Sequence, residues 1–395
     1  MAITTSTLAA SYFVLDVPDV RWTDAADGRR VRVVIVPGND AQVEFSEPYV
    51  PDNGVVTLRG LAELLQPYVR PCPTPLRRDL VQGRGVWLAT VVRASFTAQL
   101  YNEPAEGQEA QMIGQAFHSY AYYASRRTTA TPGATAMWLT RYTERIILPQ
   151  QPITLSVMLM AGMSARYQCQ GVDSNGELIQ ATVNIDLEAS NGAAIGSAPA
   201  YASVVHTTVA ALTEAAQMAR LHRITVELLK NGTVVDSVTY HIDYSHHAQL
   251  RIIAFTNCFG MLETEAFTGS DEETTEMEAE FAWMDREYEK NVTREVTQHR
   301  LAARFKDDTR RNSLRDITVS PEIYLINDNG TDCWEKMTLT GFEMTDRRPH
   351  SEPQTANITL RPSAMYQEEV ARRGDTDSGE TRHRIFDYTH DYTFN

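Results

Sequence analysis

The sequence is poor in cysteine. Its four cysteines lie far apart in the chain, at Cys72, Cys169, Cys258 and Cys333. None belongs to a Cys-x-x-Cys pair, so their spacing argues against a zinc site. We expect free thiols in a reducing compartment, with two long-range disulfides as the alternative.

Long hydrophobic runs are also missing. The longest apolar stretch, residues 153–165, is too short to span a bilayer and is interrupted by Thr154, Ser156 and Ser164. The N-terminus has neither the basic segment nor the apolar core of a signal peptide. We therefore expect a soluble protein, made in a cytoplasm, that inserts into no membrane.

Positive charge is scarce relative to negative charge. The chain has 36 Lys and Arg residues against 51 Asp and Glu residues, a formal net charge of −15. Nucleic acids and anionic membranes are bound by basic surfaces, so neither is expected as the main partner. The balance favours solubility, or a partner with a basic surface.

Recognisable catalytic motifs are absent too. The sequence contains no Gly-x-Ser-x-Gly elbow, no phosphate-binding P-loop, no Gly-x-Gly-x-x-Gly after a strand and no His-Glu-x-x-His. We expect a protein that is not an enzyme and carries no cofactor or metal. A pair of carboxylates for sugar hydrolysis stays open, because their spacing is set in space and not along the sequence.

What the sequence has in quantity is the pattern of β-sheet. Its 395 residues include 17 Tyr, 12 Phe and 5 Trp, which suit sheet packing. In residues 224–244 apolar and polar residues alternate on both sides of Asn231-Gly232, a pair typical of a tight hairpin turn. The run from Leu250 to Phe255 is apolar on both faces, which predicts a central, buried strand.

A few helices interrupt this pattern. Leucines at helical spacing predict a short helix in residues 58–68, and a second short helix is expected at 313–317. Residues 204–220 fit either a strand or a helix. The fold class predicted is mostly β, with several antiparallel β-sandwich domains and a few short helices.

Three domains follow from the turns and prolines. We expect an N-terminal β-rich domain with a short helix at 1–149, a middle β-sandwich at 150–256 and a C-terminal β-rich domain at 257–395 with a charged, flexible tail. Residues 87–100 are predicted to form one strand of the first domain, and residues 275–298 two long strands of the third.

Two clusters of polar residues invite a functional interpretation. Residues 263–289 hold eleven acids and one base, Arg286, which suggests a docking patch, a divalent-ion site or the solvated face of a strand. We favour the solvated face, because the acids alternate with apolar residues. A cluster of His241, His246 and His247 at a hairpin end is expected to be exposed rather than to bind a metal.

Three stretches taken together resemble virion structural proteins of tailed bacteriophages and of prophages of gut bacteria. They are FVLDVPDVRW (13–22) with YVPDNGVVTLRGLAELLQPYV (49–69), RIIAFTNCFGMLETEAFTG (251–269) and SLRDITVSPEIYLI (313–326). The middle stretch resembles a turn that such proteins carry after a buried strand.

The resemblance implies a structural, non-enzymatic component of the tail, neck or fibre-attachment region. Asn257, Gly260, Glu263 and Gly269 would hold the turn. The expected partners are further copies of the chain and other virion proteins, and the expected location is the virion, after synthesis in the bacterial cytoplasm. Such proteins grip neighbours through sheet edges and terminal arms. In the tail of this chain, Tyr388, Tyr392 and Phe394 would serve as interface residues.

Two other functions remain open. One is an adhesin that binds a carbohydrate or a receptor, such as a host surface glycan, with Tyr122 and Tyr123 in an aromatic-rich stretch as the glycan contact. The other is a hydrolase acting on glycans.

Overall fold

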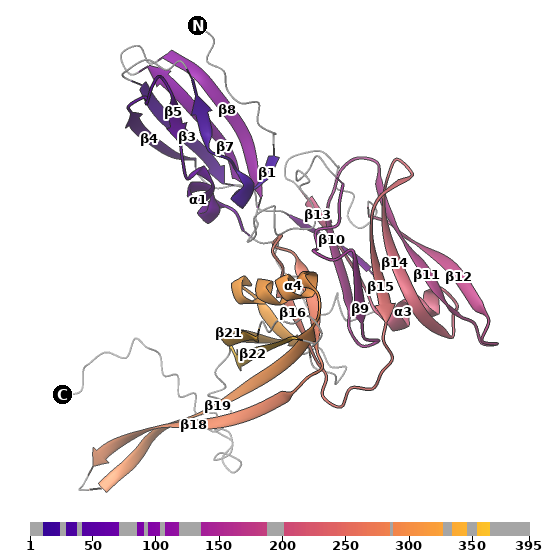
Figure 1. Cartoon of the computed structure of the whole chain (residues 1–395). Coiled ribbons are helices and arrows are strands. Elements are labelled where there is room, and N and C mark those ends of the chain that lie inside the picture. Colours follow the sequence, from indigo (N-terminus) through magenta and orange to yellow (C-terminus); the bar gives the residue numbers. More distant parts are fainter. Residues whose placement is uncertain are drawn as a thin grey trace, which may run out of the picture.

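The computed structural model describes residues 11–23, 29–37, 42–70, 85–90, 94–102, 107–117, 136–187, 201–284, 287–326, 334–345 and 354–363. Over these residues the chain is mostly β, with several antiparallel sheets and few short helices, which confirms the predicted fold class. Figure 1 shows three β-rich units, which we call the N-terminal unit, the sandwich and the C-terminal unit.

The N-terminal unit is a five-stranded sheet with a small second layer packed on its inner face. The sheet has the order β1-β8-β7-β3-β4, and the second layer consists of the pair β2-β5 with the helix α1 and two 3-10 turns. The predicted helix near residue 60 is confirmed, with Leu61 and Leu65 buried. The elements are β1 (Ser11–Phe13), η1 (Val14–Asp16), β2 (Val20–Trp22), β3 (Arg29–Pro37), β4 (Val43–Tyr49), β5 (Val56–Leu58), α1 (Leu61–Leu65), η2 (Gln66–Tyr68), β7 (Ala94–Asn102) and β8 (Gly107–Phe117).

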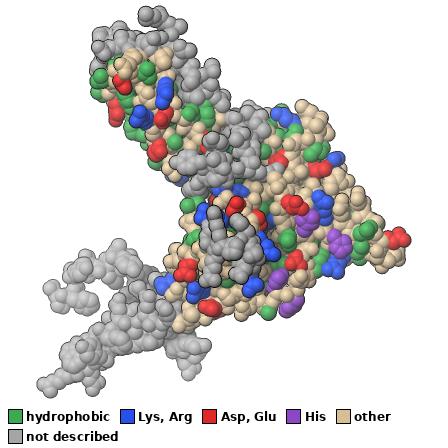
Figure 2. Space-filling model, viewed as in Figure 1, with side chains coloured by type: hydrophobic (Ala, Val, Ile, Leu, Met, Phe, Trp, Pro, Cys, Tyr) green, Lys and Arg blue, Asp and Glu red, His purple; other side chains and the backbone are tan. Residues whose placement is uncertain are grey.

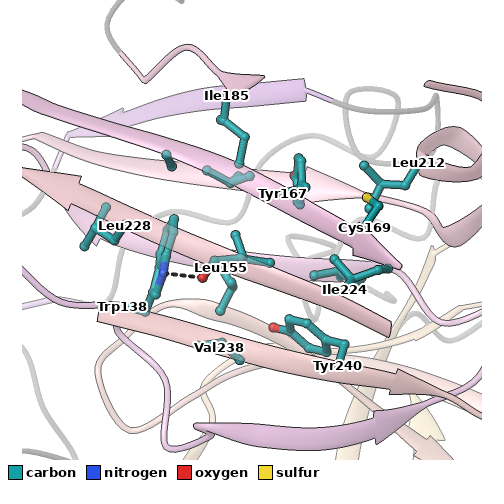
Figure 3. Packing of buried hydrophobic residues seen from close by; sticks show 14 of the residues in the cluster. Trp138, Leu155, Tyr167, Cys169, Ile185, Leu212, Ile224, Leu228, Val238 and Tyr240 are labelled. Atoms are coloured by element: carbon teal, nitrogen blue, oxygen red, sulfur yellow. Dashed lines mark hydrogen bonds between the residues drawn. The ribbon is translucent and has the colours of Figure 1, made fainter. Parts of the chain in front are cut away.

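The sandwich packs a three-stranded sheet, β10-β13-β6, against a five-stranded sheet, β12-β11-β14-β15-β9. Trp138 is fully buried in its core, and the indole Nε1 donates a hydrogen bond of 3.2 Å to the carbonyl oxygen of Val226 (Figure 3). The elements are β6 (Gly85–Thr90), β9 (Glu144–Ile147), β10 (Ile153–Met158), β11 (Met163–Val172), β12 (Leu178–Ile185), β13 (Tyr201–Thr207), α3 (Val209–Ala215), β14 (Arg220–Lys230) and β15 (Thr233–Ile242).

Two local predictions for the sandwich are resolved by its backbone. Asn231 and Gly232 both have positive φ, at 50° and 79°, and join β14 to β15 in the predicted hairpin. The stretch 204–220, left open between strand and helix, contains both. It begins in β13 and continues into α3, whose N-cap Thr208 accepts a hydrogen bond from the backbone N–H of Ala211.

The C-terminal unit is a seven-stranded sheet of order β17-β16-β20-β21-β22-β19-β18, with the helix α4 against it. The helix predicted at 313–317 is longer than expected, because Asp307 caps it a turn earlier. The elements are β16 (Arg251–Thr256), β17 (Leu262–Phe267), β18 (Asp271–Met284), β19 (Glu287–Phe305), α4 (Asp308–Val319), β20 (Ile323–Ile326), β21 (Trp334–Thr345) and β22 (Gln354–Pro362).

The two long strands predicted at 275–298 are β18 and β19, which pair with each other from Asp271–Leu301 to Met284–Glu287. The next strand of the sheet, β22, pairs with β19 only at residues 299–305. From the pair Thr275–Thr297 to the pair Met284–Glu287 the ribbon is therefore two-stranded among the described strands, over about 30 Å. We call residues 275–297 the arm, and Figure 1 shows it extending away from the rest of the molecule.

Strand pairing crosses the expected domain boundaries at 149 and 256. β6 pairs with β13 of the sandwich, although it was assigned to the first domain together with β7 as one strand at 87–100. β9, also from the first segment, pairs with β15. β16, the buried run expected beside β15, pairs instead with β17 and β20.

Candidate functional site

The turn predicted at Asn257 lies at the point where the three units meet. It joins β16 to β17, and its residues Cys258, Phe259 and Met261 are buried. They pack against Phe13 of β1 and against residues of the sandwich, namely Met137, Leu139, Met158 and the half-buried Trp87. The rings of Phe259 and Phe13 are 5.3 Å apart between centroids, which is close enough for a favourable aromatic contact. We call this turn, residues 257–261, the junction turn.

The side chain of Asn257 holds the junction turn in shape. Its Oδ1 accepts hydrogen bonds from the backbone N–H groups of Phe259 and Met261, at 3.0 and 3.2 Å. Its Nδ2 donates to the carbonyl oxygen of Leu139, at 2.9 Å, and to Glu263, at 2.8 Å. All four interactions are buried. One amide side chain therefore both fixes the conformation of the turn and connects it to the sandwich.

Of the other three residues predicted to hold this turn, Gly260 belongs to it. Glu263 follows it in β17 and contacts Asn257, and Gly269 lies elsewhere. Gly260 has a φ of +76°, which favours glycine, and its N–H donates to the carbonyl oxygen of Asn257. Gly269 lies beyond the far end of β17. A Cβ there would be 2.8 Å from the carbonyl oxygen of Ala302, so its backbone lies too close to β19 for a side chain.

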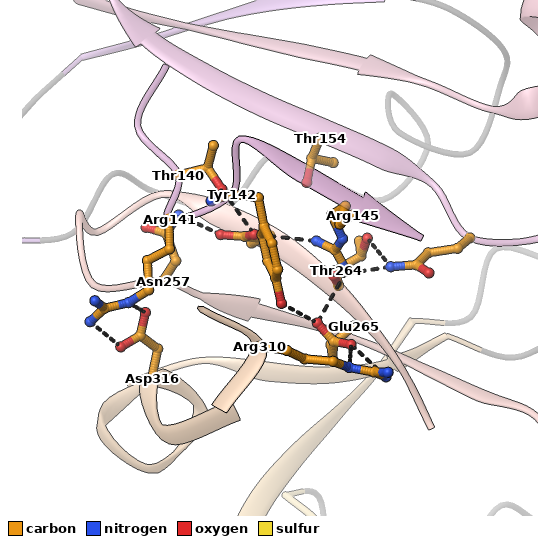
Figure 4. Close-up of polar contacts among 12 residues, drawn as sticks. Thr140, Arg141, Tyr142, Arg145, Thr154, Asn257, Thr264, Glu265, Arg310 and Asp316 are labelled. Atoms are coloured by element: carbon orange, nitrogen blue, oxygen red, sulfur yellow. Dashed lines mark hydrogen bonds and ion pairs between the residues drawn. The ribbon is translucent and has the colours of Figure 1, made fainter. Parts of the chain in front are cut away.

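A network of buried charges continues from the junction turn along β17. Glu263 accepts hydrogen bonds from Thr140 at 3.1 Å and from Arg145 at 3.3 Å. Glu265 accepts from Arg145 and from the hydroxyl of Tyr142, both at 3.1 Å, and from Arg310 of α4 at 3.0 Å. Figure 4 shows these groups converging between the sandwich and the C-terminal unit.

A second ion pair lies on the other side of the junction turn. The guanidinium of Arg141 donates two hydrogen bonds of 2.9 Å to the carboxylate of Asp316 in α4. Asp316 also accepts the backbone N–H of Cys258 at 3.2 Å. The network thus matches three arginines with three carboxylates, and pairing of this kind offsets the cost of burying each charge. Its charged members are Arg141, Arg145, Arg310, Glu263, Glu265 and Asp316.

The same side chains seal the free edge of β17. This strand pairs with β16 on one side only among the described strands. On its other side the carbonyl oxygens of alternate residues accept side-chain hydrogen bonds: Leu262 from Thr154, Thr264 from Arg145 and Gln151, and Ala266 from Arg310. An open strand edge is a site of unwanted pairing, and here polar side chains from β9, β10, the turn between them and α4 cover it.

The surroundings of these groups shift their pKa values. Burial raises the pKa of Glu263, although Arg145 and Asn257 oppose the shift. Burial alone would lower the pKa of Arg141, but the hydrogen bond to Asp316 and nearby negative groups raise it. Burial, followed by the charge of Asp316, raises the pKa of the Cys258 thiol well above its ordinary value. Such a thiol is a poor nucleophile at neutral pH.

The arrangement is suited to holding elements together rather than to chemistry on a ligand. Glu263 and Glu265 are only 4% and 2% exposed, and both are occupied by arginine, amide or hydroxyl donors. This burial corrects the interpretation of residues 263–289 as one solvated face. The first two acids of this stretch, Glu263 and Glu265, are buried ion-pair partners. Glu272 and Glu273 in β18 are exposed, as expected.

The histidines of the expected cluster do not converge. His241 contacts Glu144 of the neighbouring strand β9, and His247 lies 3.8 Å from Asp243. Figure 2 shows histidine side chains spread over the surface of the sandwich. In the described part of the chain no three His, Cys, Asp or Glu side chains are grouped closely enough to hold a metal ion. No helix within the described ranges is both long and apolar enough to span a membrane.

The remaining predicted residues lie outside the described residues. They are the proposed interface residues Tyr388, Tyr392 and Phe394 and the proposed glycan contacts Tyr122 and Tyr123. Sequence reasoning missed the arginines of the network, Arg141, Arg145 and Arg310. The one available signal was the pair of acids in the strand 262–267, which needs distant cations if that strand is buried.

Comparison with known proteins adds no family. No family model matches the chain, and no curated protein matches it. Among solved structures, the full extracellular region of plexin A4 aligns at 8% sequence identity, over 88% of this chain and 38% of that one, with a TM-score of 0.16. A likeness this weak carries no argument about fold or function.

Proposed function

We propose that the chain is a structural, non-enzymatic component of a phage particle, in the region of the tail, the neck or the fibre attachment. It acts through contacts with other copies of itself and with other virion proteins. The resemblance of three stretches of its sequence to virion structural proteins suggests the particle, and the arm is the observation that carries the assembly role.

The arm has the form of an element made for contact with another molecule. A two-stranded ribbon is at best marginally stable alone in water and usually needs a third strand or a packed face. The arm nevertheless continues for about 30 Å beyond the last strand that pairs with it. A neighbouring subunit that packs on the ribbon, or adds a strand to it, would supply the missing support.

The charge of the arm suggests the kind of surface it meets. Residues 276–296 contain seven acids and three bases. Together with the formal charge of −15 for the whole chain, this favours a contact surface that carries basic residues. The junction turn and its ion pairs support the same role, because a projecting arm transmits position only if the units behind it are held rigidly.

Shortening the arm tests the proposal. Asn-Gly in place of residues 276–296 would close the hairpin at the pair Thr275–Thr297 and leave the rest of the sheet unchanged. Light scattering after size exclusion, with negative-stain images, should show symmetric oligomers for the full chain and smaller species for the shortened one.

The matched control shortens a different exposed hairpin. Replacing residues 173–177 with Asn-Gly closes β11 and β12 at the pair Val172–Leu178, and this variant should assemble like the full chain. Circular dichroism would verify that both variants are folded. A full chain that stays a monomer at every concentration, or an arm-shortened chain that assembles normally, would refute the proposed role of the arm.

A further inference from the structure

The outer edge of the N-terminal unit has an open strand. β4 is the last strand of its sheet and pairs with β3 alone among the described strands. Figure 1 shows it on the rim of that unit. Pro48, which has no backbone N–H, limits the part of this edge that can accept another strand to about Val43–Glu47.

A groove lies directly beside this edge, on the inner face of the sheet. It has a volume of about 200 Å³. A dry cavity of roughly 150 Å³ is large enough to bind benzene, so the groove has room for one aromatic ring. Its lining combines apolar residues with one acid and one base: Val31, Val33, Phe45, Tyr49, Leu58, Gly60 and Leu64, with Glu47 and Arg59.

The lining residues of β4 alternate along the strand, as a strand-addition site requires. Phe45, Glu47 and Tyr49 line the groove, although Glu47 is also exposed. Glu44, Ser46 and Pro48 are exposed and do not line it. A strand added along β4 would place every second side chain over the same groove. Backbone hydrogen bonds would then supply affinity, and the groove would select the side chain that enters it.

The C-terminal residues of the chain have the matching pattern. In residues 387–394, DYTHDYTF, Tyr388, His390, Tyr392 and Phe394 alternate with Thr389, Asp391 and Thr393. Tyr, Phe and Thr favour strands, and one face of such a strand would be entirely aromatic. The linking residues 364–386 are long enough, at up to about 3.4 Å per residue, to carry this segment well away from β22.

We propose that residues 387–394 of one copy bind as an added strand along β4 of a second copy, with the ring of Tyr392 or Phe394 in the groove. The contact is heterologous, because two different surfaces meet, so repetition would close a ring or extend a filament. The choice of a second copy rests on the proposed assembly function, whereas the groove and the aromatic pattern do not.

Photo-crosslinking in the full chain tests this contact. p-Benzoylphenylalanine replaces Tyr392 in one sample, and Thr393, on the opposite face, in the control. Each of these two proteins is prepared once with natural and once with heavy isotopes. The light and heavy forms of the same protein are mixed and equilibrated, and cross-linked peptides are identified by mass spectrometry. We expect heavy-to-light links from position 392 to residues 43–64, and few from position 393. Links only between like isotopes would show docking within one chain, and an absence of links to 43–64 would remove the site; either result overturns the proposal.

A pair of tail variants gives an independent measurement. Tyr392→Ser with Phe394→Ser removes both rings proposed to enter the groove, whereas Asp391→Asn with Thr393→Ser changes the other face. Loss of one buried ring should weaken association between copies by at least roughly tenfold in sedimentation experiments, with the control unchanged.

The arm-shortened chain separates the tail contact proposed here from the assembly role proposed for the arm. If the arm-shortened chain still gives heavy-to-light links, the tail contact forms without the arm. If full chains assemble but give no such links, the tail contact is refuted while the assembly function stands.

Discussion

At the scale of single residues, Asn257 joins the junction turn to the sandwich and to β17. Its amide satisfies two backbone N–H groups, one carbonyl oxygen and one carboxylate, all of them buried. Removing the amide takes away four buried hydrogen bonds, and a buried polar group that loses its partner costs more than the bond itself contributes.

Asn257→Ala should therefore lower the free energy of unfolding by about 3 kcal/mol. Urea denaturation followed by tryptophan fluorescence measures this change. The control is Asn175→Ala in the exposed β11–β12 turn, where a change within about 0.5 kcal/mol is expected. Equal effects at the two positions would contradict the role assigned to Asn257.

Glu263 should make stability depend on pH in a predictable direction. Its pKa in the folded protein is raised above the ordinary value of 4.5, chiefly by burial. The folded state then holds this proton more tightly than the unfolded state does. The contribution of Glu263 to stability is largest below pH 4.5 and falls as the pH rises through the pKa of the folded state.

Glu263→Gln removes this titration. We expect the stability of the unaltered protein minus that of Glu263→Gln to decrease as the pH rises from about 4 to neutrality. Urea midpoints measured across this range provide the difference. An increase with pH would mean that the ion pair with Arg145 dominates and that the pKa is lowered instead.

At the scale of elements, α4 connects the buried ion pairs to the sheet. It supplies Arg310 to Glu265 and Asp316 to Arg141. Its first turn is fixed by Asp307, whose carboxylate accepts the backbone N–H of Arg310 at 2.8 Å. Loss of this cap would loosen the turn that carries Arg310.

Asp307→Ala should cost about 1 kcal/mol of stability, the usual value for an N-cap. Asp308→Ala, one residue later, removes an exposed acid from the same turn and should cost about half as much or less. Thermal unfolding by circular dichroism compares the two. Identical losses would show that helix charge, and not the cap, stabilises this end of α4.

The elements also show which features were readable from the sequence. Asn231-Gly232 predicted its hairpin because the requirement for positive φ is local. Residues 87–100 were misread as one strand, since nothing local reveals that β6 and β7 belong to different sheets. The acids of β17 were read as solvated for a similar reason, because alternation along a strand is the same whether water or a distant arginine faces the carboxylate.

At the scale of the whole molecule, the junction turn connects three separate cores. The resemblance pointed to Asn257, Gly260, Glu263 and Gly269 as residues of one turn. The first three lie together in the structure, whereas Gly269 lies against β19. What the turn contacts was not predictable, because Phe13, Leu139 and Asp316 lie 58 or more positions away along the chain. Long-range contacts of this kind leave no trace in the periodicity of a single sequence.

If the junction turn makes one rigid body from the three β-rich units, the arm and the open edge of β4 are held in fixed positions. Differential scanning calorimetry of the full chain, beside Asn257→Ala, tests this most directly. We predict one cooperative transition for the unaltered protein, and at least two separated transitions for the variant, as the units melt independently. Separate transitions in the unaltered protein would contradict the account, since its units would then be joined by the chain alone.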